Sequence, residues 1–181
     1  MPAQVGQPAP PFKLDSTKDI KTLKDPVSLD EYKGKWLAII FYPLDFTFVC
    51  PTELLAFSDR VEEFKNLGAE VLGVSTDSKF SHRAWIQTPR DQNGIQGLRY
   101  PLAADFNKTM ARDYDVLDEG AGLALRGLFI IDPNGVLQYK VVHSLNIGRS
   151  VDETLRVLQA LQTGGLCPAE WKPGQKTLVV G

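Results

Sequence analysis

The sequence contains two cysteines, and Cys50 is the one whose surroundings favour reactivity. It directly precedes Pro51, and proline is favoured in the first turn of a helix. Free backbone N–H groups and the helix dipole at such a terminus favour an anion, so they favour the thiolate, the nucleophilic form of cysteine. The alternative is a small buried apolar residue, the role of many free cysteines. The position beside Pro51 makes a reactive thiol the hypothesis to test.

Cys167 lies far from Cys50 in the sequence, in a C-terminal stretch between Gly165 and Pro168. A mobile thiol can condense with a cysteine sulfenic acid, and these flanking residues suit that task. The sequence alone does not show that the two sulfurs meet. The N-terminus has no basic region followed by an apolar stretch, so we expect no signal peptide and a cytoplasmic protein. In a reducing compartment, two cysteines are more often inert, metal-binding or redox-active than a permanent disulfide.

The elements that must position Cys50 follow from the apolar pattern. Residues 36–42 are a continuous apolar run, which predicts a central strand buried on both faces. A helix should follow from Pro51, because an apolar stripe recurs there at helical spacing. The residues of that stripe are Leu54, Phe57, Val61 and Phe64.

Further strands and helices are predicted along the rest of the chain. Strands are expected at residues 70–75, 102–104, 125–131 and 136–142, and helices at residues 81–88 and 108–114. Residues 132–135, Asp-Pro-Asn-Gly, have the composition of a tight turn. The last helix should start at Ser150, because Glu153 three residues later completes a capping box.

This order of elements predicts an α/β protein with a mixed central sheet flanked by helices, similar to the thioredoxin fold. The length of 181 residues is that of one domain. We therefore expect a domain over residues 1–165. Residues 166–181 have no periodic apolar face and should form a flexible C-terminal tail that carries Cys167.

Composition and spacing exclude several classes of function. The 20 basic and 22 acidic residues form no basic block, so no nucleic-acid partner is expected. The longest apolar run, residues 36–42, is too short to span a membrane. Two cysteines and two histidines at distant positions lack the spacing of a zinc site. The chain has neither the Cys-x-x-Cys of a disulfide reductase nor a Gly-rich phosphate loop. We expect no metal and no organic cofactor.

The residues around Cys50 carry a more specific signal. Residues 41–53, FYPLDFTFVCPTE, contain the pattern Pro-x-x-x-Thr-x-x-Cys and resemble the active-site signature of peroxiredoxins. The whole stretch is similar to the typical two-cysteine subfamily, which includes bacterial alkyl hydroperoxide reductase C. The similarity extends from about residue 5 to residue 172 and includes residues 124–132, 148–154 and 167–174.

The resemblance implies a role for each of five residues. Cys50 would be the peroxidatic cysteine and Cys167 the resolving cysteine. Thr47 would hydrogen-bond the peroxide, Pro43 would shield the site from water, and Arg126 would hold the thiolate and the peroxide oxygen. In the subfamily the disulfide links two subunits, so the resemblance also implies a homodimer. Such dimers commonly assemble into decameric rings.

Elementary chemistry supports these roles. Attack on a peroxide needs a thiolate in line with the O–O bond and donors near the leaving oxygen. A threonine hydroxyl can accept from the peroxide while donating elsewhere. Arg126 stays protonated, and within the apolar residues 122–131 its charge must be paired or functional. We expect Glu53 as its partner, with Arg149 in the same network. For Glu53 and Arg149 the alternative is helix-end capping or surface pairing.

The expected function is the reduction of hydrogen peroxide and organic hydroperoxides. The Cys50 thiolate attacks the peroxide, Cys167 condenses with the resulting sulfenate, and an external dithiol reduces the disulfide by exchange. The resemblance implies thioredoxin as the donor, and a dedicated flavoprotein or another thioredoxin-like protein is the alternative.

Three other functions stay open from the sequence. A Cys-His hydrolase would need His82 or His143 beside Cys50. A holdase chaperone would use the oligomer, and a redox relay would pass the oxidation of Cys50 to a partner protein. Substitution of Cys50 by serine distinguishes the holdase, which should survive it, from a peroxidase or a relay, which should not.

Overall fold

The computed structural model describes residues 2–179. The terminal residues 1 and 180–181, which belong to the predicted domain and tail, lie outside the described residues. The chain divides into two compact units, Met1–Arg149 and Ser150–Gly181.

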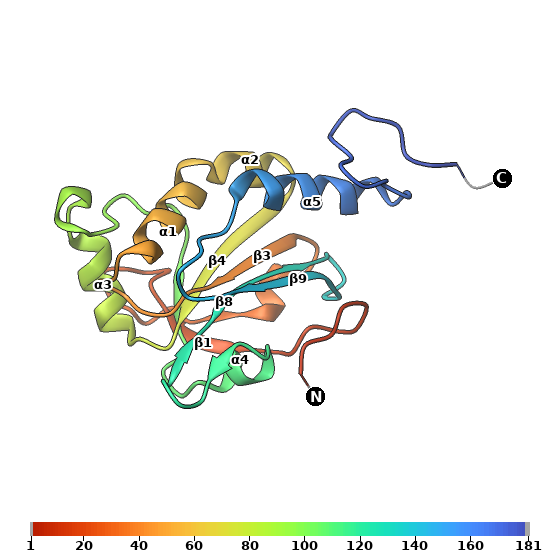
Figure 1. Ribbon diagram of the computed structural model, residues 1–181. Helices are drawn as coiled ribbons and strands as arrows, with labels where there is room; N and C mark the ends of the chain where they lie inside the picture. The colour runs from red at the N-terminus through yellow and green to blue at the C-terminus, as the bar shows by residue number, and fades with distance from the viewer. Residues whose placement is uncertain (1, 180–181) are drawn as a thin grey trace. The chain divides into compact units, whose positions relative to one another are not determined.

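The first unit is built on a mixed seven-stranded sheet in the order β2-β1-β5-β4-β3-β8-β9 (Figure 1). Its strands are β1 (Lys13–Ser16), β2 (Val27–Ser28), β3 (Trp36–Phe41), β4 (Ala69–Ser75), β5 (Leu102–Ala104), β8 (Arg126–Ile131) and β9 (Leu137–His143). β6 (Leu117–Asp118) and β7 (Leu123–Ala124) form a separate pair. The predicted central strand is confirmed: β3 runs parallel to β4 and antiparallel to β8, and it is buried from residue 37 to residue 41.

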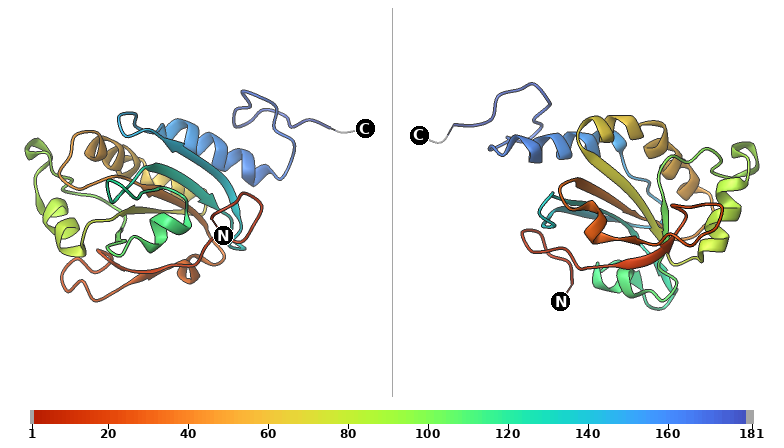
Figure 2. Two further views of the ribbon diagram at one scale, coloured as in Figure 1. Left: turned by 60° about the horizontal axis from the view of Figure 1, so that its bottom comes forward. Right: turned by 180° about the vertical axis from the view of Figure 1, so that it is seen from behind.

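Helices cover both faces of this sheet, as the alternation of strands and helices predicts. The helices of the first unit are α1 (Val49–Asp59), α2 (Val61–Asn66), α3 (Lys79–Gln87) and α4 (Thr109–Asp113), with short 3-10 helices η1 (Leu29–Tyr32) and η2 (Arg90–Gln92). α1 and α2 lie on one face and α4 on the other (Figures 1 and 2). The α/β prediction with a thioredoxin-like mixed sheet is confirmed.

The sequence predicts one helix after Pro51, whereas the structure has two. The chain departs from helical geometry at Arg60, with φ −110° and ψ 15°, and α2 begins at the next residue. All four residues of the predicted apolar stripe, Leu54, Phe57, Val61 and Phe64, are nevertheless buried. Neither glycine nor proline marks the break, so the apolar spacing does not reveal it.

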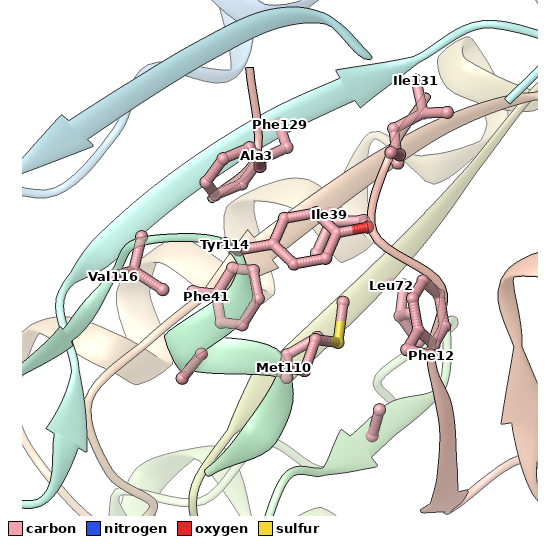
Figure 3. Packing of buried hydrophobic residues seen from close by; sticks show 14 of the residues in the cluster. Ala3, Phe12, Ile39, Phe41, Leu72, Met110, Tyr114, Val116, Phe129 and Ile131 are labelled. Carbon is pink, nitrogen blue, oxygen red and sulfur yellow. The ribbon is translucent and has the colours of Figure 1, made fainter. Parts of the chain in front are cut away.

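Three aromatic rings hold α4 against the sheet (Figure 3). The ring centroids of Phe41 and Tyr114 are 5.5 Å apart, those of Phe41 and Phe129 are 5.6 Å apart, and those of Tyr114 and Phe129 are 5.1 Å apart. All three side chains are buried, and the two edge-to-face pairs, Phe41–Phe129 and Tyr114–Phe129, add to the apolar burial. The end of β3, from which the chain enters the Cys50 loop, is therefore held rigidly.

The second unit consists of α5 (Val151–Thr163) and the chain that follows it. The predicted start is confirmed, because the Ser150 hydroxyl caps the helix by accepting from the backbone N–H of Glu153 at 3.2 Å. Gly164 ends the helix with φ 66°, a left-handed conformation that glycine adopts without strain. No helix in the described part of the chain is long and apolar enough to cross a membrane.

The chain after α5 folds back on itself through a few hydrogen bonds. A single bridge joins Leu166 and Leu178, whose N–H donates to the Leu166 carbonyl at 2.8 Å. The Trp171 indole is buried, and the Trp171 backbone carbonyl accepts a hydrogen bond from the Arg156 guanidinium of α5 at 3.0 Å. These contacts place Cys167 near the end of the helix.

Candidate active site

Cys50 lies in the first turn of α1, which begins one residue earlier at Val49. Its side chain is fully buried, and Pro51 follows it inside the helix. The N-cap residue, Phe48, makes no side-chain hydrogen bond to the first turn. The N-terminal backbone groups that favour an anion are therefore not satisfied by the cap. This is the helix start that the Cys-Pro pair predicts.

Arg126 brings a guanidinium to the sulfur of Cys50. It is the first residue of β8, and its Nη1 lies 3.4 Å from the Cys50 Sγ. The same Nη1 donates to Glu53 Oε2 at 2.6 Å, and the Arg126 Nε donates to the Leu145 carbonyl at 2.6 Å. Because Arg126 is only 3% exposed and hydrogen bonds hold its guanidinium through two nitrogens, the charge is fixed beside the thiol.

Glu53 joins two arginines into one buried cluster. Its Oε1 accepts from the backbone N–H and the Nε of Arg149, each at 2.7 Å. Its Oε2 accepts from Arg149 Nη2 at 2.9 Å as well as from Arg126. Two guanidinium groups against one carboxylate leave one net positive charge. This positive charge lies beside the Cys50 sulfur, where it can pair with the negative charge of a thiolate.

Arg149 also ties this cluster to the sheet. Its Nη1 donates to the carbonyls of Phe41 and Gly127, both at 2.6 Å. These carbonyls lie at the end of β3 and near the start of β8. The sequence named Glu53 and Arg149 as members of one network with Arg126, and the structure brings the three together. The sequence did not indicate the contacts of Arg149 with the two strands.

The loop of residues 42–48 carries the other predicted site residues. The Thr47 hydroxyl donates to the Leu44 carbonyl at 2.9 Å, which leaves its lone pairs free to accept a hydrogen bond. Pro43 is buried in the same loop. The carbonyl of Thr47 accepts from the side-chain amide of Asn93 at 2.7 Å. Asn93 was not among the residues predicted from the sequence.

A second buried network, also not predicted, anchors this loop through Asp45. His82 Nδ1 lies 2.8 Å from Asp45 Oδ2, and its Nε2 lies 3.2 Å from the Ala103 carbonyl. The Tyr42 hydroxyl donates to Asp45 Oδ1 at 2.7 Å, and burial raises the pKa of Tyr42 well above its usual range. The hydrogen-bond partners described for His82 and His143 do not include Cys50, so these contacts give no support to a Cys-His hydrolase.

Asp77 extends this network. Its Oδ2 accepts from the Asp45 backbone N–H at 2.9 Å and from the Ser75 hydroxyl at 2.6 Å. Burial, and secondly the negative charge of Asp45, raises the pKa of Asp77. Ligand atoms of Asp45, Asp77 and His82 lie within 4.8 Å of one another. Hydrogen bonds from neighbouring hydroxyls occupy the two carboxylates, so we interpret the group as an anchor of the loop.

Cys167 belongs to the second unit and is half-buried at the C-terminal end of α5. Its Sγ lies 3.7 Å from the Ala160 carbonyl. Both cysteines are free thiols in this structure.

A thioredoxin-like sheet that holds a buried thiol beside a fixed guanidinium defines a thiol-dependent redox enzyme. The model of the AhpC/TSA family matches residues 5–140. The putative peroxiredoxin YkuU of Bacillus subtilis is 60% identical over 176 residues, which cover 96% of this chain and 97% of that protein. Peroxiredoxin-2 of Macaca fascicularis is 53% identical over 180 residues, covering 97% and 90%.

Solved structures agree with these relatives. Reduced 2-Cys peroxiredoxin of Plasmodium vivax is 40% identical with a TM-score of 0.92, covering 97% of this chain and 93% of that one. AhpC of Enterococcus faecalis is 34% identical with a TM-score of 0.83, covering 98% and 99%. The chain therefore belongs to the AhpC/TSA family and is a peroxiredoxin, a thiol-dependent peroxidase.

Proposed function

We propose that Cys50 is the peroxidatic cysteine of this enzyme. The observation that carries the proposal is the Arg126 guanidinium 3.4 Å from the Cys50 sulfur, within a cluster of one net positive charge. The thiolate attacks one peroxide oxygen, so an S–O bond forms and the O–O bond breaks. Sulfur is oxidised to the sulfenic state, and the other oxygen leaves as an alkoxide or hydroxide that takes a proton from water.

Three neighbours assist that step in our proposal. The Thr47 hydroxyl, whose hydrogen is already donated to Leu44, accepts from the peroxide and orients it. Arg126 stabilises the negative charge that develops on the peroxide oxygens. Pro43, buried in the same loop, limits the access of water. Glu53 and Arg149 support the reaction by holding Arg126.

Cys167 is the resolving cysteine in this proposal, on the tail over residues 166–181 that follows the domain of residues 1–165. Its thiol condenses with the Cys50 sulfenic acid: the S–H and S–O bonds break, an S–S bond forms, and water leaves. The resemblance to typical two-cysteine enzymes supports a disulfide between two subunits, and therefore a homodimer that can assemble into a decamer. The proposed substrates are hydrogen peroxide and organic hydroperoxides, and the proposed location is the cytoplasm.

An external dithiol completes the cycle by thiol–disulfide exchange, which returns two electrons to the pair of cysteines. We propose thioredoxin or a similar dithiol protein as this donor. A structural relative described as thioredoxin peroxidase I of Plasmodium yoelii is 42% identical with a TM-score of 0.81 and supports this choice.

Non-reducing gel electrophoresis after one equivalent of hydrogen peroxide tests the proposal on the wild type and on Cys50→Ser and Cys167→Ser. We expect a disulfide-linked dimer that requires both cysteines. Mass spectrometry of the same samples locates the bond. A Cys50–Cys167 bond within one chain would overturn the subunit arrangement alone, whereas the absence of any oxidation at Cys50 would overturn the central assignment. Untreated protein is the control.

A further inference from the structure

The sulfur of Cys167 faces two oxygen atoms at the end of α5. One is the Ala160 carbonyl at 3.7 Å, and the other is the Thr163 hydroxyl oxygen at 3.5 Å. The Thr163 hydroxyl donates its single hydrogen to the Ala160 carbonyl at 2.8 Å. The backbone N–H of Gly165 donates to the Thr163 oxygen at 3.1 Å and fixes its position. While the Thr163 hydrogen is donated to the Ala160 carbonyl, both oxygens next to the sulfur can accept a hydrogen bond from it.

A thiol S–H can donate to either oxygen, so the two contacts hold the Cys167 thiol at the end of α5.

We propose that Thr163 is a positioning residue for Cys167 in the reduced enzyme. Together with the Ala160 carbonyl, it holds the Cys167 thiol at the end of α5 and opposes its release for the resolution step. This inference rests on the proposed function, in which Cys167 resolves the Cys50 sulfenic acid. The condensation consumes the S–H, so the hydrogen bonds that this S–H donates exist only in the reduced enzyme. These contacts with Thr163 and the Ala160 carbonyl, which we call the Cys167 dock, therefore stabilise the dithiol relative to the disulfide. They must break before the two sulfurs join.

The reduction potential of the Cys50–Cys167 couple measures this preference. The protein is equilibrated with mixtures of oxidised and reduced dithiothreitol, and mass spectrometry then gives the fractions of dithiol and disulfide. Thr163→Val removes the hydroxyl and keeps the branched shape, so it should shift the equilibrium about three- to tenfold toward the disulfide. That shift equals a potential about 14 to 30 mV more negative. Thr163→Ser restores the hydroxyl and should restore the wild-type potential. Thr109→Val, at an exposed threonine that opens α4, is the matched control and should change nothing.

Single-turnover kinetics provide a second readout. In Thr163→Val, sulfenate formation at Cys50 should keep its wild-type rate, and disulfide formation should become about threefold faster, because no dock has to be released. A substitution that merely loosened the helix end would lower the thermal stability without a change in potential.

Two results would overturn the inference: an unchanged potential in Thr163→Val, or equal shifts in the valine and serine variants. Its failure is distinguishable from failure of the proposed function. If the wild type forms no Cys50–Cys167 disulfide, the proposed function is wrong. If the wild type forms it and Thr163→Val matches the wild type, only the role of Thr163 is wrong.

Discussion

One cysteine lies at the N-terminus of a helix, and the other lies near the C-terminus of a different helix. Cys50 lies in the first turn of α1, fully buried, with a guanidinium nitrogen 3.4 Å from its sulfur. Cys167 is half-buried near the last turn of α5, with a carbonyl oxygen 3.7 Å from its sulfur. One sulfur therefore faces a positive charge and N–H donors, and the other faces acceptors. The fold thus gives the same side chain two different sets of partners.

This difference indicates how one protein can keep two thiols in separate roles. A peroxide meets an activated sulfur only at Cys50, because the cluster around Glu53 supplies the charge that a thiolate requires. In the proposed cycle, Cys167 reacts only after the Cys50 sulfenic acid has formed. Variants that alter only one of the two surroundings should therefore alter only one of the two sulfurs.

The largest effect is expected from Glu53→Gln, which leaves Arg126 and Arg149 without a countercharge. Removal of one partner from a buried ion cluster typically costs about 3–5 kcal/mol, so the free energy of unfolding should fall by about that amount. Urea denaturation measures it. The matched control is Glu153→Gln, because Glu153 pairs with Arg156 on the partly exposed surface of α5, with Nε and Oε2 2.6 Å apart. That variant should lose less than about 1 kcal/mol. Equal losses of unfolding free energy in the two variants would contradict the idea that the buried cluster supports the Cys50 site.

Arg126→Met should reduce kcat/KM for hydrogen peroxide by about 10²–10³-fold, the usual effect of removing one transition-state donor. The stopped-flow rate of sulfenate formation measures this loss. Alkylation of Cys50 should slow in the same variant, whereas alkylation of Cys167 should not change. Arg112→Met, which removes an arginine paired with Glu119 on the exposed surface, should keep the wild-type rate. A normal Cys50 rate in Arg126→Met would refute the contrast between the two sulfurs.

A smaller effect is expected from Asn93→Gly. Glycine tolerates the left-handed φ of 61° at this position but loses the 2.7 Å hydrogen bond to the Thr47 carbonyl. One hydrogen bond is worth about 1 kcal/mol, so sulfenate formation should slow about fivefold as the Thr47 loop loosens. Asn134→Gly, in the turn between β8 and β9, serves as the control. An unchanged rate in Asn93→Gly would show that the loop does not need this contact.

The sequence predicted the elements around Cys50 better than the contacts between them. The apolar run of β3 and the Cys50-Pro51 pair are local signals, and each reports its own element. Arg126 was informative because a charge inside an apolar stretch requires a partner. The break at Arg60 was missed, since no local residue type enforces it.

Contacts between distant segments were mostly beyond the sequence, because the register of the sheet sets them. Ile40 pairs with Leu128 across β3 and β8, and this register places two strand carbonyls within reach of Arg149. The contact between Asp45 and His82 likewise depends on how α3 packs against β5. Neither residue has a local pattern that names the other.

The smallest expected effect concerns Asp77, which anchors the Cys50 loop through the Asp45 backbone. Burial, and then the charge of Asp45, raises the Asp77 pKa above its ordinary 3.8, so the ionised form costs more in the folded chain than in the unfolded chain. The free energy of unfolding therefore decreases as the pH rises from 3.8 through the folded pKa. Asp77→Asn keeps an oxygen for the Ser75 hydroxyl and removes the charge. Its Tm should exceed the wild-type Tm by roughly 2 °C near neutral pH.

Below the ordinary pKa of Asp77, where both folded and unfolded chains hold the proton, the two Tm values should converge. Differential scanning calorimetry between about pH 3 and pH 7 checks this convergence. Asp91→Asn, at an exposed aspartate, controls for a general change in net charge. If the Tm difference of Asp77→Asn persisted at low pH, its origin would be packing and not ionisation. In that case, the anchor of the Cys50 loop would not depend on pH. It would then resemble the contacts of Cys167, which come from a carbonyl and a hydroxyl.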